Sequence, residues 1–148
     1  METESASGHP YLILQSDGAA RGNPGPAAFG AVAMDPGTGE VFAVGRAMGN
    51  TTNNVAEYQG IIEALRMAQR LGAARILLEA DSELLIKQLE GRYKVKAEHL
   101  VPLHAECVRL LQSFQNYLLR HIPREQNTMA DRLANRALDV QSRASARG

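Results

Sequence analysis

Apolar residues in the first third of the chain gather in three short runs separated by glycine- and proline-rich segments. The runs at residues 11–16, 27–34 and 41–48 have the length and the aliphatic content of strands. The segments between them, GNPGP (22–26) and DPGTG (35–39), contain residues that fix turn conformations, and the second is a strong hairpin signal. The pattern predicts an antiparallel three-stranded meander.

After residue 50 the apolar positions change to helical spacing. The polar run NTTNN (50–54) supplies a cap for a first helix, and Gly72 stands where that helix would end. The apolar face of this helix contains Ile61, Ile62, Leu65, Ala68 and Leu71. RILLEA (75–80) then predicts a fourth strand, and Ser82 can cap a short helix over residues 83–90.

The rest of the chain predicts two further helices and one strand. Behind the basic segment GRYKVK (91–96), a helix runs to about Phe114, with Pro102 tolerated in its first turn. One side of it carries Leu103, Cys107, Leu110 and Leu111. A fifth strand covers residues 116–122, and a last helix covers about 127–140.

The predicted order of elements is β-β-β-α-β-α-α-β-α, which indicates an α/β fold. A meander followed by helical crossovers requires parallel pairing of the last two strands. We therefore expect one mixed five-stranded sheet, three strands antiparallel and two parallel, flanked by helices. We also expect a single domain at residues 10–140, between a disordered leader at 1–9 and a disordered tail at 141–148.

Composition narrows the class of protein. Hydrophobic residues occupy 45% of the 148 positions and aromatic residues only 5%, so the core must be largely aliphatic. No apolar run approaches the roughly 20 residues that cross a bilayer, so we expect no membrane partner. The start lacks the order of a signal peptide, and Cys107 is the only cysteine. These features favour the cytoplasm, and nothing in the sequence suggests more than a monomer.

The net charge of zero hides an uneven distribution. Residues 1–90 hold 11 acids and 6 bases, a balance of −5, and residues 91–148 hold 5 acids and 10 bases, a balance of +5. Either half could be an ordinary solvated surface, so this polarity is weak support for a polyanionic partner.

Two acidic residues in the first half of the chain occupy positions where burying a charged carboxylate costs free energy. Asp17 follows an apolar strand, where burying it requires something that neutralises or coordinates it. Glu57 points along the apolar face of the first helix, because Ile61 is four residues further on. The alternative for Glu57 is a capping box with Asn54, three residues earlier.

Two more acids occupy comparable positions in the second half. Asp81 ends the fourth strand, and its alternative role is N-terminal capping shared with Ser82. Asp131 lies in the last helix with Ala134 and Leu138 on its own face, and its alternative role is a surface ion pair with a nearby arginine.

Taken together, the four acids predict a metal centre. If the first and fourth strands are neighbours, Asp17 and Asp81 meet at one edge, and like charges a few ångströms apart need cations between them. Hard oxygen ligands select Mg²⁺, or Mn²⁺ in its place, over zinc. Two such ions about 3.5–4 Å apart are the usual apparatus of in-line phosphodiester displacement.

Four motifs give the chain a resemblance to type 1 ribonuclease H, over about residues 11–139. They are DGAARGNPGPAAFGAV (17–32), TNNVAEYQGIIEAL (52–65), LEADSELLIKQL (78–89) and PREQNTMADRLANRA (123–137). The resemblance implies a ribonuclease H-like fold and a two-magnesium hydrolysis of the RNA strand of RNA/DNA hybrids that leaves 3′-hydroxyl and 5′-phosphate ends. It places the catalytic and metal-binding acids on Asp17, Glu57, Asp81 and Asp131.

The resemblance also implies a set of substrate contacts. The backbone of Gly18, Ala19 and Ala20, together with Asn23, is expected near the RNA strand. Asn53 and Asn54 are expected in the minor groove, although capping of the first helix is an equal alternative for them, and Thr52 is expected at a DNA phosphate. Glu83 stands where the family often uses glutamine to touch RNA.

The sequence departs from well-studied bacterial members at two places. The segment LRHIPREQN (119–127) is short, as in the archaeal-like branch, so Arg124 rather than His121 is expected to assist at the scissile phosphate. Only three bases, in segment 91–96, stand where many members carry a basic handle, and we expect the handle to be missing. Three alternatives remain: a nuclease that also cleaves double-stranded RNA, a hybrid-binding module without catalysis, and a purely structural domain.

Overall fold

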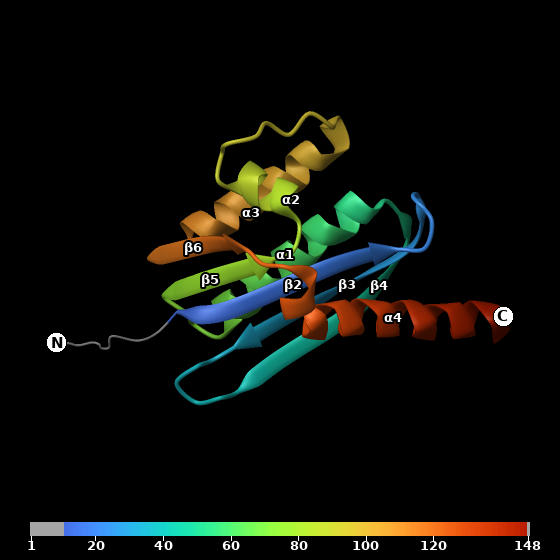
Figure 1. Cartoon of the computed structure of the whole chain (residues 1–148), viewed down its shortest axis with the longest axis horizontal. Helices are drawn as coiled ribbons and strands as arrows, with labels where there is room; N and C mark the ends of the chain where they lie inside the picture. Colours follow the sequence, from blue (N-terminus) through green and yellow to red (C-terminus); the bar gives the residue numbers. More distant parts are fainter. Residues whose placement is uncertain (1–10, 148) are drawn as a thin grey trace.

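The computed structural model describes residues 11–147. A five-stranded sheet in the order β4-β3-β2-β5-β6 forms its centre (Figure 1). The strands are β2 (Leu12–Ala20), β3 (Gly25–Met34), β4 (Val41–Thr51), β5 (Arg75–Ala80) and β6 (Asn116–His121). β2, β3 and β4 are antiparallel, whereas β5 and β6 run parallel to β2. The predicted mixed sheet is confirmed.

Helices cover both faces of the sheet (Figure 1). They are α1 (Asn53–Arg70), α2 (Glu83–Leu89), α3 (Val101–Gln112) and α4 (Thr128–Arg147), with short 3₁₀ turns η1 (Glu98–Leu100) and η2 (Arg124–Gln126). α1, α2 and α3 share one face and α4 lies on the other. Among the described residues, no helix is both long enough and apolar enough to span a membrane.

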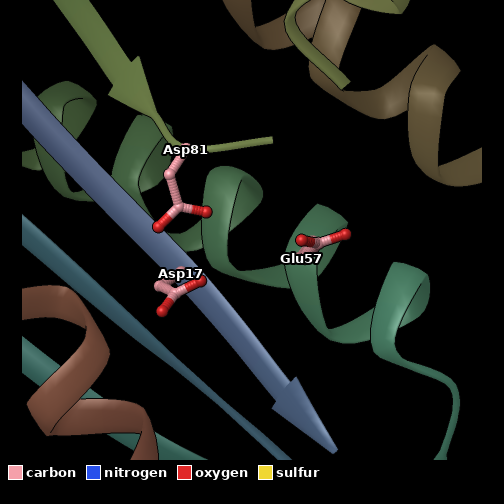
Figure 2. Close-up of side chains that lie close together, drawn as sticks. All are labelled: Asp17, Glu57 and Asp81. Atoms are coloured by element: carbon pink, nitrogen blue, oxygen red, sulfur yellow. The ribbon is translucent and has the colours of Figure 1, made fainter. Parts of the chain in front are cut away.

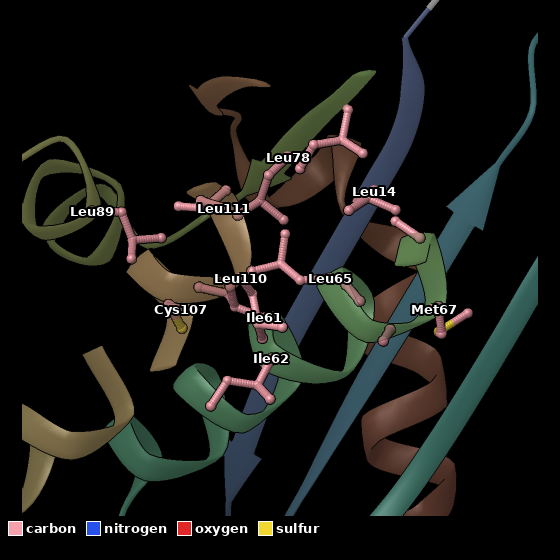
Figure 3. Close-up of a cluster of buried hydrophobic side chains, with 14 of the residues drawn as sticks. Leu14, Ile61, Ile62, Leu65, Met67, Leu78, Leu89, Cys107, Leu110 and Leu111 are labelled. Carbon is pink, nitrogen blue, oxygen red and sulfur yellow. The ribbon is translucent and has the colours of Figure 1, made fainter. Parts of the chain in front are cut away.

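The main core lies between the sheet and the three helices α1, α2 and α3 (Figure 3). Alternate residues of β2 and β5 point into it, because side chains along a strand alternate between the two faces. Its members are mostly aliphatic, as the composition predicts, and include Leu14, Ile61, Leu65, Leu78, Cys107, Leu110 and Leu111. Leu71, the last of the helically spaced apolar residues, does not join them: it is the C-cap of α1 and is 42% exposed.

The hairpin between β2 and β3 is longer than predicted. Pairing continues to Ala20 opposite Ala27, and β3 begins at Gly25, so only residues 21–24 lie between the two strands. Small residues such as Ala19 have low strand propensity, and tertiary pairing overrides it here. β4 likewise extends to Thr51, beyond the end predicted at residue 48.

The last helix is also longer than predicted. α4 continues to Arg147, so both its predicted end near Val140 and the disordered tail expected from residue 141 were wrong over residues 141–147. The segment QSRASAR contains no glycine or proline, and its alanine, arginine and glutamine are good helix formers. The leader expected at residues 1–9 lies outside the described residues.

Candidate active site

Three carboxylates from distant parts of the sequence meet near the end of β5. Asp17 belongs to β2, Glu57 to α1, and Asp81 follows β5 directly. Each offers one oxygen, and these three oxygens all lie within 4.8 Å of one another. Figure 2 shows the three side chains and the elements that carry them. Backbone elements remote in sequence thus supply a single cluster of acids.

Strand pairing makes Asp17 and Asp81 neighbours. β2 pairs in parallel with β5 as far as Ser16 and Ala80, and β5 then ends. The next residue of each segment is an acid, so Asp17 and Asp81 lie side by side where the pairing of β2 with β5 ends. The prediction that Asp17 ends its strand was wrong, because β2 continues to Ala20 by pairing with β3.

A glycine in β2 lets the start of α1 approach the strand. A Cβ atom on Gly18 would lie 2.7 Å from the Cα atom of Glu57, so any side chain at this position would push the helix away. Thr52 caps the helix, and its hydroxyl accepts a hydrogen bond from the N–H of Val55 at 3.3 Å. Asn54 is therefore not the cap, which removes the capping-box alternative for Glu57.

On the opposite face of the sheet, two glycines allow α4 to pack closely against the strands. Gly30 and Gly45 stand in one row with Asp17 across β3, β4 and β2. A Cβ on Gly45 would lie 2.6 Å from the carbonyl oxygen of Leu133, and one on Gly30 would overlap with the carbonyl oxygen of Ala130. The backbone of α4 therefore rests directly on the sheet, beside the row that contains Asp17.

Asp131 enters the site from the first turn of α4. Ala134 and Leu138 are buried, as predicted. The carboxylate is close enough to Asp17 to raise the pKa of that group, although it does not belong to the three mutually close oxygens. Its side chain is 34% exposed and lies 4.0 Å from Arg124, a contact too long and too solvated to stabilise the protein much.

The electrostatics of the cluster disfavour ionisation. Asp17 is 6% exposed, and burial is the largest cause that raises its pKa, to about 8; the charge of Asp81 is the next. Burial followed by the charge of Asp81 raises the pKa of Glu57 to about 7, while Arg124 acts in the opposite direction. Without a cation, these two carboxyl groups therefore keep protons near neutral pH, where isolated carboxyl groups have already released them.

The donor atoms fit a hard divalent cation. All of them are carboxylate oxygens, and Oδ2 of Asp17 is buried without a hydrogen-bond donor among the described residues. The alternative of helix capping does not account for Asp81 either. Ser82 caps α2, since its hydroxyl accepts from the N–H of Leu85 at 3.3 Å. Asp17 Oδ1 accepts a hydrogen bond from the N–H of Gly18 at 3.0 Å, but neither Glu57 nor Asp81 caps a helix, so capping does not explain the cluster.

A cavity of about 460 Å³ opens over the acids. Its volume is large enough for part of an extended ligand, and its lining is predominantly polar. The lining residues are Asp17, Gly18, Ala19, Ala20, Asn53, Glu57, Asp81, Arg124 and Asn135. Most of the predicted contacts from the β2–β3 hairpin and the start of α1 therefore border the same space.

Four predicted substrate-binding residues do not line this cavity. Asn23 accepts a hydrogen bond from the N–H of Asn53 at 3.0 Å and so ties the β2–β3 turn to α1. Thr52 is the cap of α1, and Asn54 is exposed in its first turn. Glu83 forms an exposed ion pair with Lys87 at 3.3 Å, which gives it a structural partner within α2.

The two candidates for an auxiliary residue are placed differently. Arg124 begins η2 and lines the cavity, and its side chain is 76% exposed. His121 is the last residue of β6 and is exposed, but it does not border the cavity.

Two amides at the site were missed by sequence reasoning. Asn127 is fully buried and donates to Asp81 Oδ2 at 3.1 Å. Asn135 donates to Asp131 Oδ1 at 3.2 Å, and its position one helical turn after that acid was a usable signal. No comparable signal marks Asn127, because its partners are remote in sequence.

Comparison with known proteins identifies relatives over most of the chain. Residues 15–137 match the reverse transcriptase-like family. The bifunctional protein Rv2228c of Mycobacterium tuberculosis is 41% identical over 136 residues, which are 91% of this chain but 37% of that protein. Ribonuclease HI of Halobacterium salinarum is 43% identical over 88% of this chain and 64% of that protein. This chain thus spans only part of the length of these relatives.

Solved structures agree with the fold. The N-terminal RNase H domain of Rv2228c superposes with a TM-score of 0.87 at 40% identity, covering 91% of this chain and 98% of that one. LC11-RNase H1, solved in complex with an RNA/DNA hybrid, gives 0.81 at 39% identity, covering 88% and 98%. The fold and the acid cluster define a ribonuclease H-like protein. The chain belongs to the type 1 ribonuclease H family.

Proposed function

We propose that this protein is a metal-dependent endonuclease that hydrolyses the RNA strand of RNA/DNA hybrids. The reaction is an in-line phosphodiester hydrolysis with two metal ions, and it leaves 3′-hydroxyl and 5′-phosphate ends. The observation that carries the proposal is the meeting of the Asp17, Glu57 and Asp81 oxygens within 4.8 Å, at the floor of a polar cavity.

The three clustered acids, with Asp131 beside them, are the proposed metal ligands. Mg²⁺ is the expected ion and Mn²⁺ a substitute, because all the donors are hard oxygens. Bound there, divalent ions supply an activated water and charge stabilisation for the leaving oxygen. The unpartnered Oδ2 of Asp17 supports this assignment, because a buried carboxylate oxygen normally has a partner.

The residues around the cavity bind and orient the substrate in this proposal. The backbone of Gly18, Ala19 and Ala20 lies along the RNA strand. Asn53, at the start of α1, faces the minor groove, where the 2′-hydroxyl distinguishes RNA from DNA. Arg124 contacts the scissile phosphate from the cavity rim, and its charge favours the negative form of Glu57 nearby.

The domain that contains residues 11–147 is the proposed catalytic domain, acting as a monomer in the cytoplasm. The hybrid is the proposed partner because the chain is 39% identical to a ribonuclease H1 that was solved in complex with one. Contacts to phosphates position a substrate without reading its sequence, so we expect little sequence preference.

A cleavage assay tests this function. Purified protein is incubated with end-labelled RNA/DNA hybrid, double-stranded RNA or duplex DNA, in Mg²⁺, Mn²⁺ or EDTA. We expect cutting of the hybrid RNA strand only, dependent on metal, with 5′-phosphate ends on the products. Asp17→Asn should abolish cutting, whereas Glu98→Gln, at an exposed acid outside the cavity, should not.

The outcomes separate the alternatives. Metal-dependent cutting of double-stranded RNA as well would broaden the substrate class. Hybrid binding without cutting would identify a binding module, and neither binding nor cutting would indicate a structural domain. Activity that survives Asp17→Asn would contradict the role of this acid as a ligand.

A further inference from the structure

Asn127 lies at the point where four parts of the site meet. It follows η2, precedes α4, and is fully buried. Its side-chain amide donates to the carbonyl of Ser16 at 2.9 Å and to Oδ2 of Asp81 at 3.1 Å. Its backbone N–H donates to the carbonyl of Arg124 at 2.9 Å, and its own carbonyl accepts from the N–H of Asp131 at 3.1 Å.

These contacts fix the orientation of the amide. Ser16 and Asp81 present only acceptors to it, so the nitrogen must face them, and an amide has two N–H donors to give. The amide oxygen of Asn127 is buried without a partner among the described residues. An unsatisfied buried acceptor is destabilising, so stability alone does not account for an asparagine at this position.

The contact to Asp81 has a direct consequence for metal binding. A carboxylate held through one oxygen keeps its other oxygen available and stops rotating, which lowers the entropy lost when a cation binds. Groups that orient metal ligands in this way typically contribute about 10- to 100-fold in metal affinity. The backbone contact to Asp131 links the same residue to the start of α4.

We propose that Asn127 is a positioning residue that holds Asp81, and through its backbone Asp131, ready for divalent cations. This inference rests on the proposed metal-dependent function. It assigns Asn127 no contact with substrate, so its effect should appear in metal affinity and kcat and not in hybrid affinity.

The test compares Asn127→Ala with the matched control Asn116→Ala, at an exposed position at the start of β6. Mn²⁺ affinity is measured by calorimetry on the full chain without substrate, and thermal unfolding reports the folded fraction. We expect Asn127→Ala to bind Mn²⁺ about 10- to 100-fold more weakly and to need correspondingly more metal for cleavage. Hybrid KM at saturating metal should stay within about threefold.

The failure of this inference is distinct from the failure of the proposed function. If the unaltered protein binds Mn²⁺ and cuts hybrid, but folded Asn127→Ala binds Mn²⁺ within about twofold of it, the positioning role is wrong. If the unaltered protein neither binds metal nor cuts, the function itself is wrong, and the inference with it.

A measurement on the unaltered chain covers variants that do not fold. The side-chain NH₂ resonances of Asn127 should exchange with solvent far more slowly than those of Asn116, and should shift when Mg²⁺ is added. An Asn127 amide that exchanges freely, or that is insensitive to Mg²⁺, would overturn the assignment.

Discussion

Replacing Asp17 by asparagine is expected to stabilise the metal-free protein while it abolishes turnover. In the folded protein, burial and neighbouring acids raise the pKa of this carboxyl from 3.8 to about 8. Because the folded-state pKa is the higher one, folding favours the protonated form. The destabilisation is therefore absent below about pH 4, grows as the pH rises, and is complete above about pH 8.

The size of the effect follows from this shift. One pKa unit corresponds to about 1.4 kcal/mol, so a shift of about four units sets an upper limit of roughly 6 kcal/mol. The buried amide that replaces the carboxylate carries its own desolvation cost of about 1–3 kcal/mol when unpaired. We therefore expect Asp17→Asn to raise the free energy of unfolding by roughly 3–5 kcal/mol above pH 8 in EDTA.

Urea unfolding of both proteins at pH 5, 7 and 8.5 in EDTA measures this difference, with Glu98→Gln as the control. The gain should increase with pH, and Mg²⁺ should reduce it, because the ion stabilises only the protein that binds it. A variant that is less stable than the unaltered protein at pH 8.5, or a difference that does not change with pH, would refute the electrostatic argument.

Three further predictions address packing, catalysis and binding. Gly30→Ala should lower the free energy of unfolding by about 3 kcal/mol in urea titration, because the added Cβ overlaps with Ala130. The control Gly72→Ala, which has open space around it, should lower it by only about 1 kcal/mol. Equal losses would contradict the close packing of α4. Arg124→Ala should lower kcat about 100-fold while His121→Ala changes it little, and the reverse order would reassign the auxiliary role. The slope of log affinity for hybrid against log salt should be about −3 or shallower, since few bases stand in segment 91–96, and a slope steeper than about −5 would indicate a functional handle.

The sequence predicts most of the fold because its patterns are local. Alternating and helically spaced apolar residues, with turn residues between them, mark every strand and helix. The acids were recognisable for the same reason: Glu57 and Asp131 stand on helix faces that are otherwise apolar, where a solvated surface residue is not expected. That contrast can be read without knowing any distance.

Other features depend on contacts that no local pattern encodes. β2 reaches Ala20 because β3 pairs with it, and α4 passes Val140 because nothing in the following segment breaks a helix. Asn127 was missed because its partners, Ser16 and Asp81, lie 111 and 46 residues away. The role of such a residue can be identified only from the folded structure.

The glycine row beneath α4 makes correct strand alignment a condition for activity. Gly30 stands opposite Asp17, and the residues on either side of it, Phe29 and Ala31, carry side chains. If β2 and β3 paired with their register shifted by one residue, the side chain of Phe29 or Ala31 would lie under α4. This side chain would keep Asp131 away from the other acids. Misaligned molecules should therefore be inactive rather than partly active, so that turnover per molecule reports the fraction of chains that have folded correctly.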